Sequence, residues 1–340
     1  PSCLYPYSFN PKGKFMTTLY LDRKNLTLRA DGDALVCYEN DGRIATVPLK
    51  VLQRVCIRGD ITLSAKVLSK LGEAGVGVLI LNGRQNRPAL MLPNWKLDGK
   101  RRVAQYALSQ DKAASLAAAR NTVAAKLSAQ QQHLQQMACS DNRNAACLNN
   151  HSQALANLVD AISSSPDIAA LRGIEGAAAA RYFSAWASVL PENWHFTGRN
   201  KRPPRDPLNA TLSLAYTLLH FDIVKHLYLS GLDPFIGYYH QPEHGRESLA
   251  CDLLEHLRSL CDVWVLSLFY QETLTPEDFS TTAQGCLMSK NARIKFYPAY
   301  EATAKQWRSH IHQLCADYLA ILSQYSGQPE IQLSGLTTLE

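Results

Sequence analysis

The stretch NWKLDGKRRVAQY, from Asn94 to Tyr106, separates two parts of the chain that differ in sequence pattern. Before it, short alternating runs such as ALVCYE and RIATVPL are divided by ADGD and NDGR. This alternation predicts β-strands, and glycine or asparagine at the breaks predicts tight turns. After it, residues 103–137 are rich in alanine and glutamine, a composition that favours helix. The chain therefore predicts an α+β fold, with a small β-rich domain followed by a nearly all-α domain.

The same contrast sets the expected domain boundaries. The first residues, PSCLYPYSFNPKGK, contain three prolines, which is typical of a linker. The chain begins on Pro1 rather than methionine, which is compatible with a processed product or with a fragment of a longer fusion. We expect one helix in the β-rich part, over residues 60–75. We divide the chain into a linker (1–14), a β-rich domain (15–93), a basic hinge (94–102), a helical domain (103–330) and a tail (331–340).

Aspartate and proline mark helix starts in the second domain. We expect Pro166 at the first position of one helix, with Asp167 near its positive end, and Asp206 as the cap of another helix, before Pro207. An acid at a helix start accepts hydrogen bonds from free backbone N–H groups, and proline is tolerated in the first turn. We therefore expect helices through RGIEGAAAARYFSAWASVL and through LNATLSLAYTLLHFDIVKHLYLSG. ACSDNRNAACLNN, before them, is expected to be a polar loop.

Composition favours a globular protein of the cytoplasm. Of 340 residues, 46% are hydrophobic and 19% are charged, and no apolar run has membrane-spanning length. We find no signal-peptide pattern and therefore expect a cytoplasmic protein. The nine cysteines form no CxxC pair, which argues against a zinc ribbon or a secreted disulfide framework.

The net charge of +6 is a mild basic bias that is compatible with a polyanion partner. Basic residues crowd two regions, and solvated loops and nucleic-acid contacts are both open interpretations of either cluster. The first cluster comprises Arg84, Arg87, Lys96, Lys100, Arg101 and Arg102, and the second comprises Arg199, Lys201, Arg202 and Arg205.

A helix expected from about Glu247 to Leu260 carries two acids beside a stripe of leucines. Leu249, Leu253, Leu257 and Leu260 fall on one face at helical spacing. Asp252 and Glu255, three residues apart, lie on an adjoining flank. Two acids on one flank repel each other unless something positive lies between them. Solvent, or a salt bridge to Arg258 or Arg246, is the simplest alternative to a functional site.

His240 changes this interpretation, because it precedes the helix by a turn that can fold back over the helix start. A neutral imidazole with carboxylates suits Mn²⁺ or Mg²⁺ better than a thiolate-preferring ion. His244 is a rival ligand, although its PEHGR context indicates turn surface. His310 and His312 would point apart on a helix, so we interpret them as structural or exposed.

A further carboxylate is expected from elsewhere in the chain. Glu175 lies between Gly173 and Gly176 on an alanine-rich helix. Small neighbours allow another backbone, or a nucleic acid, to come close. The alternative is tight helix packing with Glu175 exposed at the edge.

Three blocks occur in order along the chain: GIEGxAAxxYF (Gly173 to Phe183), RPPxDPLNAxLSLxYTLL (Arg202 to Leu219) and GLDPFIGYYHxPxxGRxSLAxDLLE (Gly231 to Glu255). Together they closely resemble the integrase subunit of CRISPR spacer acquisition, the larger subunit of the adaptation complex. The resemblance covers most of the chain, and each block is fairly specific. It implies a β-sandwich-like N-terminal dimerisation domain followed by an all-α catalytic domain.

The resemblance also implies a metal site with Mg²⁺ or Mn²⁺ as the cofactor. Glu175, His240 and Glu255 match the expected catalytic ligands, and Asp252 matches a second acid that some members use. The implied reaction is transesterification, in which the 3′-hydroxyl ends of a captured DNA attack phosphodiesters of the CRISPR repeat. The metal would stabilise the charge of the transition state.

The resemblance implies several partners. These are captured DNA and repeat DNA, a second copy of the chain, a small ferredoxin-like subunit and, in some members, a fused reverse transcriptase. We expect Arg246, in the turn after His240, to hold a DNA phosphate. The full set of expected nucleic-acid contacts is Arg246, Arg199, Lys201, Arg202, Arg205, Lys290, Arg293, Arg101 and Arg102.

Two other functions are compatible with these residues. A general metal-dependent DNase or junction nuclease would use the same site, because only the nucleophile differs between hydrolysis and strand transfer. A DNA-binding scaffold with an inactive site is the second alternative. The intact acid–histidine–acid set argues against the scaffold.

Overall fold

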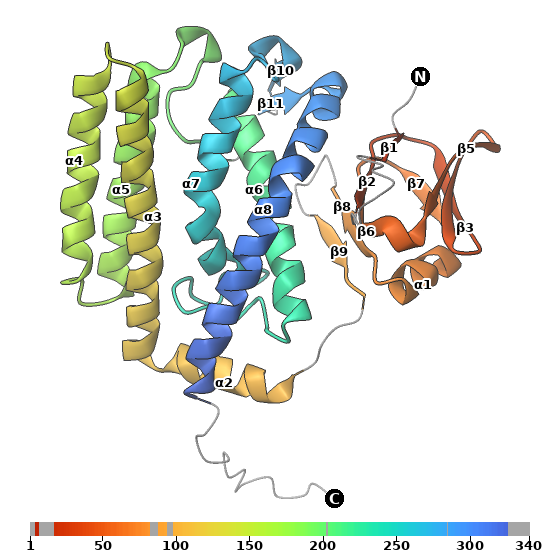
Figure 1. Ribbon diagram of the computed structural model, residues 1–340, viewed down its shortest axis with the longest axis horizontal. Coiled ribbons are helices and arrows are strands. Elements are labelled where there is room, and N and C mark those ends of the chain that lie inside the picture. Colours follow the sequence, from red (N-terminus) through yellow and green to blue (C-terminus); the bar gives the residue numbers. More distant parts are fainter. Residues whose placement is uncertain are drawn as a thin grey trace, which may run out of the picture.

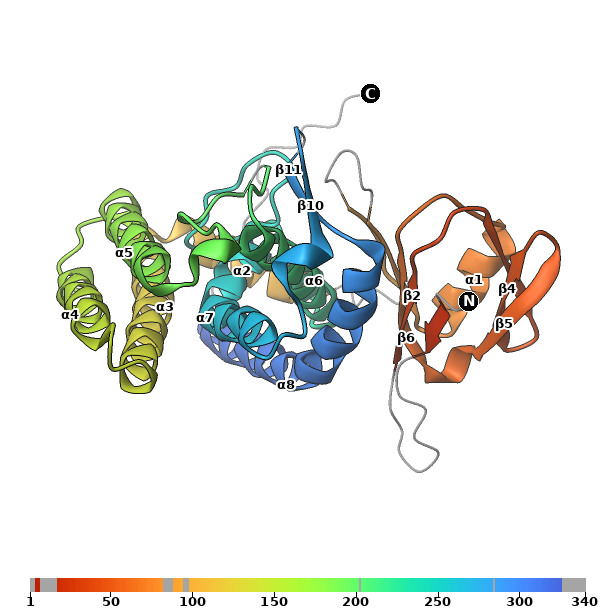
Figure 2. The same ribbon diagram turned by 90° about the horizontal axis from the view of Figure 1, so that it is seen from above.

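The computed structural model describes residues 4–6, 17–81, 88–93, 98–201, 203–283 and 285–325. Within them, a β-rich domain lies beside a helical domain, so the predicted α+β class is confirmed (Figures 1 and 2). The expected linker, apart from Leu4–Pro6, lies outside the described residues, as does the expected tail. Four basic residues named above also lie outside them: Arg84, Arg87, Lys96 and Arg202.

Two sheets form the β-rich domain. Its strands are β1 (Leu4–Pro6), β2 (Thr17–Leu21), β3 (Leu26–Asp31), β4 (Ala34–Glu39), β5 (Gly42–Pro48), β6 (Leu52–Ile57), β7 (Ile61–Leu63), β8 (Gly77–Ile80) and β9 (Ala89–Met91). One sheet has the order β1-β2-β6-β8-β9 and the other has the order β5-β4-β3-β7. Both sheets contribute to one buried core, which includes Leu19, Leu28 and Val55. Alternation along each strand turns these side chains to the inner face.

The helix expected over residues 60–75 is shorter than predicted. Ile61–Leu63 forms strand β7, which pairs in parallel with Leu26–Leu28. Helix α1 (Ala65–Glu73) begins only after it. Leucine spacing could not separate the two, because a run of three residues suits either element and the pairing partner lies far back in the sequence.

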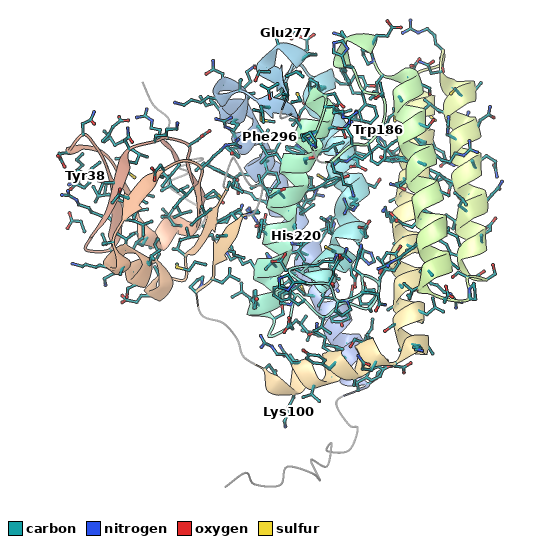
Figure 3. All side chains as sticks on the ribbon, turned by 180° about the vertical axis from the view of Figure 1, so that it is seen from behind. Tyr38, Lys100, Trp186, His220, Glu277 and Phe296 are labelled. Carbon is teal, nitrogen blue, oxygen red and sulfur yellow. The ribbon has the colours of Figure 1, made fainter. Side chains whose placement is uncertain are left out.

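Seven longer helices and one hairpin make up the described part of the second domain. They are α2 (Gly99–Gln110), α3 (Lys112–Ser140), α4 (Ala145–Ile162), α5 (Ile168–Val189), α6 (Pro207–Leu229), α7 (Ser248–Tyr270), the hairpin β10 (Phe279–Thr282) with β11 (Gly285–Met288), and α8 (Lys290–Ser323). Short 3₁₀ turns lie at Leu49–Val51, Glu192–Trp194 and Pro276–Asp278. Helices α3, α4 and α5 lie on the side of this domain away from the β-rich domain (Figures 1 and 2). The domain interior is closely filled, and Trp186 and Phe296 are fully buried in it (Figure 3).

Asp206 caps α6 as predicted, whereas α5 begins at Ile168, so Asp167 is its cap and Pro166 lies before the helix rather than at its first position. Asp167 accepts a hydrogen bond from the Ala170 amide, and Asp206 accepts one from the Asn209 amide. A third cap was not predicted. Asp111 accepts from the amides of Ala113 and Ala114 and divides the helix expected over residues 103–137 into α2 and α3.

Two further expectations need correction, and one element was not predicted. The loop expected around residues 138–150 is shorter, since α3 reaches Ser140 and α4 begins at Ala145. The motif helix continues ten residues past Leu260, to Tyr270, and Leu260 is 44% exposed rather than part of the buried stripe. The hairpin Phe279–Met288 was not predicted, because each of its strands has only four residues.

Buried charges fix the β-rich domain to the helical domain. Arg54 of β6 pairs with Asp222 of α6 at 2.8 Å and with Glu301 of α8 at 3.1 Å. Tyr20 of β2 donates a hydrogen bond to Glu301 Oε1 at 2.7 Å, and Arg308 also pairs with Glu301, at 2.9 Å. Because Arg54, Asp222 and Glu301 are almost completely buried, each needs its partner, and the two domains form one packed unit.

Candidate active site

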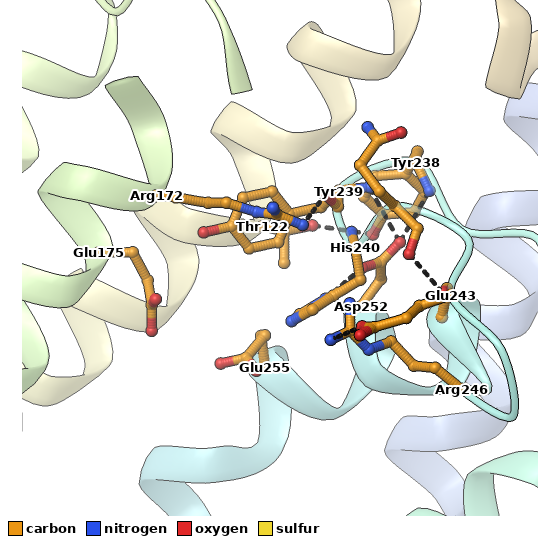
Figure 4. Close-up of polar contacts among 12 residues, drawn as sticks. Thr122, Arg172, Glu175, Tyr238, Tyr239, His240, Glu243, Arg246, Asp252 and Glu255 are labelled. Atoms are coloured by element: carbon orange, nitrogen blue, oxygen red, sulfur yellow. Dashed lines mark hydrogen bonds and ion pairs between the residues drawn. The ribbon is translucent and has the colours of Figure 1, made fainter. Parts of the chain in front are cut away.

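The backbone before α7 is held by a carboxylate of α7. Asp252 Oδ2 accepts the N–H groups of Tyr238 at 2.8 Å and Tyr239 at 3.1 Å, and Oδ1 accepts the N–H of His240 at 2.8 Å. Gly237 is required for this close approach, because a Cβ atom there would lie 2.5 Å from Asp252 Oδ2. The acid therefore fixes the chain that leads to the histidine (Figure 4).

The same carboxylate orients the imidazole of His240. Nδ1 lies 2.7 Å from Asp252 Oδ1. Since a carboxylate only accepts, Nδ1 carries a proton and Nε2 of the neutral ring keeps its lone pair. Asp252 is fully buried, and both of its oxygens are already occupied. This hydrogen bonding suits a residue that positions a histidine ligand, while direct metal binding by Asp252, which the sequence left open, stays untested.

Lys126 of α3 joins the two glutamates. Its ammonium lies 2.6 Å from Glu255 Oε2 and also pairs with Glu175 Oε1 of α5. The side chains of Lys126 and Glu255 are each 5% exposed, whereas that of Glu175 is 25% exposed. Three helices therefore bring one cation and two carboxylates together, and the glutamate that lies nearest to solvent is Glu175.

A second cation holds the other oxygen of Glu255. Arg258 Nε donates to Glu255 Oε1 at 2.8 Å, and its guanidinium lies 4.7 Å from the centre of the Tyr216 ring. Burial alone would raise the pKa of Glu255, but Arg258 and Lys126 together hold it well below its usual value. Glu255 is therefore ionised, and the salt bridge to Arg258 that the sequence left open as an alternative is present.

The glutamate and histidine side chains are not arranged closely enough to coordinate a metal ion in this structure. Among the described residues, no three His, Cys, Asp or Glu side chains lie close enough together to hold one. Glu175 and Glu255 meet at Lys126, and His240 reaches the same helix through Asp252, one turn before Glu255. Two carboxylates and an unprotonated imidazole nitrogen are donors that suit Mg²⁺ or Mn²⁺. By donor chemistry, the set fits a divalent cation.

The glycines beside Glu175 face open space. A Cβ atom at Gly173 or at Gly176 would meet no atom of the described residues within 4 Å. The alternative in which these glycines permit tight helix packing is therefore wrong. The surface next to Glu175 is left uncovered.

Arg246 and His244 lie in the turn before α7, and His244 is on the surface, as its sequence context indicated. Arg246 pairs with Glu243 within the turn, so the alternative in which it neutralises Asp252 or Glu255 is wrong. Its phosphate role stays a prediction. His244 is exposed, as are His310 and His312 on α8.

Six of the expected nucleic-acid contacts fall into two groups, those engaged by the fold and those that are exposed. Arg199 donates to Asn209 Oδ1 at 2.7 Å and also to backbone, and Arg293 pairs with Asp22 of the other domain, so both are engaged in holding the fold. Arg101 pairs with Asp98 and donates to the carbonyl of Ser230. Exposed members with no ion pair to another described residue are Lys201, Arg205 and Lys290.

Lys126 was missed by sequence reasoning, although a signal was present. Ala119, Val123, Lys126 and Gln130 recur at steps of three and four, so this lysine lies on the buried face of its helix. A lysine on such a face must have a carboxylate partner, because an unpaired buried charge is costly. The helical spacing therefore argues against Lys126 as a solvent-exposed charge.

Asp252→Asn tests the positioning role. An amide offers one acceptor where the carboxylate offers two, so the histidine loses its fixed orientation while both glutamates stay in place. We expect the affinity for Mn²⁺ and the rate of strand transfer to fall by about 10–100-fold, the cost usual for a residue behind a metal ligand. Both are measured at limiting Mn²⁺, with thermal unfolding as the control for folding. A complete loss equal to that of Glu175→Gln would contradict a positioning role.

Several known proteins are similar to this chain in sequence or in fold. The family model described as CRISPR associated protein Cas1 matches residues 19–302. The CRISPR-associated endonuclease Cas1 1 of Thermodesulfovibrio yellowstonii is 38% identical over 297 residues, which cover 86% of this chain and 93% of the relative. A Cas6-RT-Cas1–Cas2 complex matches with a TM-score of 0.80 at 22% identity, over 94% of this chain and 36% of that one. A casposase bound to integration product matches with a TM-score of 0.77 at 19% identity, over 92% and 91%.

These matches place the chain in a family of CRISPR-associated proteins. It belongs to the Cas1 family. No described helix is both long and apolar enough to cross a membrane.

Proposed function

We propose that this chain is a divalent-metal-dependent spacer integrase of the cytoplasm. It joins the 3′-hydroxyl ends of a captured DNA to phosphodiesters of a CRISPR repeat. The observation that supports this most is the convergence of Glu175 and Glu255 on one point, beside a histidine that Asp252 orients. Glu175, His240 through Nε2, and Glu255 would hold Mg²⁺ or Mn²⁺. The bound ion supplies Lewis acidity towards the phosphate and lowers the pKa of the attacking hydroxyl.

The chain's own residues supply the remaining steps. Arg258 keeps Glu255 ionised and holds its Oε1, which leaves Oε2, paired with Lys126 here, as the oxygen that would face a cation. Asp252 keeps the lone pair of His240 Nε2 available. Because Glu175 is partly exposed and its glycine neighbours leave open surface, DNA would approach from the α5 side. One phosphodiester replaces another, so no nucleotide cofactor is needed.

Lys201 is the strongest candidate for a phosphate contact at the site. It is exposed, yet partial desolvation of its ammonium, with the Arg258 and Arg199 guanidinium groups, lowers its pKa. Repulsion between neighbouring cations is reduced when an anion binds, and a DNA phosphate is such an anion. Arg205 and Lys290 are exposed as well and extend the proposed DNA path, together with Arg246.

Lys201→Ala should weaken DNA binding and reduce the salt dependence of the affinity by about one unit, the value for one lost phosphate contact. The measurement is fluorescence anisotropy of a labelled duplex across a salt series. Lys66→Ala removes the same charge from exposed α1, in the other domain, and is the matched control. An unchanged slope for Lys201→Ala would remove this residue from the DNA path.

We also propose that the chain works as a homodimer through its β-rich domain, with a small ferredoxin-like subunit. The family resemblance supports this, and a fold match is a Cas6-RT-Cas1–Cas2 complex. The same match supports association with a reverse transcriptase. Because Arg54 ties the two domains together through buried charges, the oligomeric state must be measured on the full chain by light scattering.

A substrate that lacks the nucleophile tests the reaction. The full chain, its small partner and Mn²⁺ are mixed with a repeat-bearing plasmid and a short duplex that carries 3′-hydroxyl or 3′-deoxy ends. We expect covalent joining only with the hydroxyl ends. Plasmid cleavage that is equal with both duplexes, without joining, would favour a general metal-dependent nuclease over the integrase.

A further inference from the structure

Lys126 makes its ion pairs with the two carboxylates that are expected to hold a cation. Its ammonium pairs with Glu175 and with Glu255, and only 5% of the side chain is exposed. The proposed reaction uses those carboxylates and gives this lysine no task. We propose that Lys126 is an internal counter-ion that assembles the two glutamates and is displaced when the divalent cation binds.

Charge balance supports the exchange. Glu175 and Glu255 carry two negative charges, and Lys126 and Arg258 carry two positive charges, so the four groups have no net charge. A divalent cation added to this set would create an excess of two positive charges in a buried place. Such an excess is unfavourable at low dielectric constant. Withdrawal of the lysine removes half of it.

The two cations differ in how firmly they are held. Arg258 is fixed on α7 three residues after Glu255, donates through Nε, and lies over the Tyr216 ring. Lys126 reaches from a different helix through a flexible four-carbon stem and offers an ammonium that can rotate. The lysine is therefore the cation that can leave, and the arginine is the one that stays.

Without Lys126, Glu255 would keep Arg258, but no cation would bridge the two carboxylates. The metal would then bind without displacing a competitor. The metal-free protein would in turn lose the contact that holds α3 to α5 and α7 at this point. A lysine that only stabilised the fold would leave the metal affinity of a folded variant unchanged.

The inference rests on the proposed metal site, and Mn²⁺ titration of the full chain separates the two. Lys126→Met keeps an unbranched side chain, one atom shorter, and removes its charge. We expect Mn²⁺, followed by calorimetry, to bind the variant about tenfold tighter than the wild type. Lys112→Met, an exposed change on the same helix, should match the wild type. Equal or weaker Mn²⁺ binding by folded Lys126→Met would overturn the exchange. Failure of the wild type to bind Mn²⁺ would instead refute the proposed function.

A measurement on the wild type keeps the proposal testable if Lys126→Met does not fold. Lysines are acetylated briefly with and without Mn²⁺, and each peptide is quantified by mass spectrometry. We expect Mn²⁺ to increase the modification of Lys126 while Lys112 stays constant. Protection of Lys126 that does not change with Mn²⁺ would show that the lysine stays between the glutamates, and the exchange would be wrong.

Discussion

Replacing Glu175 with glutamine should reduce strand transfer by at least about 10³-fold, comparable with the loss of a group that stabilises developing charge in a transition state. The change removes a ligand charge and keeps the size of the side chain. Glu175 is partly exposed, and Lys126 keeps Glu255 as a partner, so the fold should survive. DNA affinity should be nearly unchanged, because phosphate contacts lie elsewhere. The measurement is joining of a labelled duplex to plasmid at limiting Mn²⁺.

The other two proposed ligands should show the same loss, with a difference in stability. His240→Ala and Glu255→Gln should each abolish transfer. Glu255→Gln should also lower the unfolding temperature, since Arg258 and Lys126 then lose a buried partner. Arg29→Gln, an exposed change in the β-rich domain, serves as the active control. Wild-type activity in any one of the three variants would remove that residue from the site.

The second large effect concerns stability. Arg54→Met should lower the free energy of unfolding by about 3–5 kcal/mol, because it leaves Asp222 and Glu301 buried with fewer cations. Arg308 pairs with both acids and would offset part of the loss. Urea unfolding of the full chain measures the change. Tyr20→Phe, which removes one hydrogen bond to Glu301, should cost about 1 kcal/mol. If Arg54→Met lowers the free energy of unfolding by less than Tyr20→Phe does, the interface does not depend on the ion pairs of Arg54.

Local signals predicted much of the fold. Alternation and turn residues located most strands, and Asp206 with Pro207 located the start of α6. Such signals depend on neighbouring residues and can be read from one stretch. The missed elements depend on distant ones. Strand β7 exists because Leu26–Leu28 pairs with it, and a single capping acid, Asp111, divides a run of uniformly good helix formers.

The site was predicted less completely, for the same reason. The resemblance named Glu175, His240 and Glu255, but only the folded chain brings Lys126 between two of them. Arg199 and Arg293 belong to basic stretches and were expected to contact DNA. Their partners, Asn209 and Asp22, show that charge in the sequence does not reveal which side chains the fold itself engages.

Anomalous diffraction from crystals of the full chain grown with Mn²⁺ tests the central claim most directly. The account predicts one manganese peak, with Glu175, Glu255 and His240 Nε2 as protein ligands. Asp252 should remain bonded to His240 Nδ1, behind the ion. A peak ligated by Asp252 in place of Glu255, or no peak between the glutamates at saturating Mn²⁺, would contradict it.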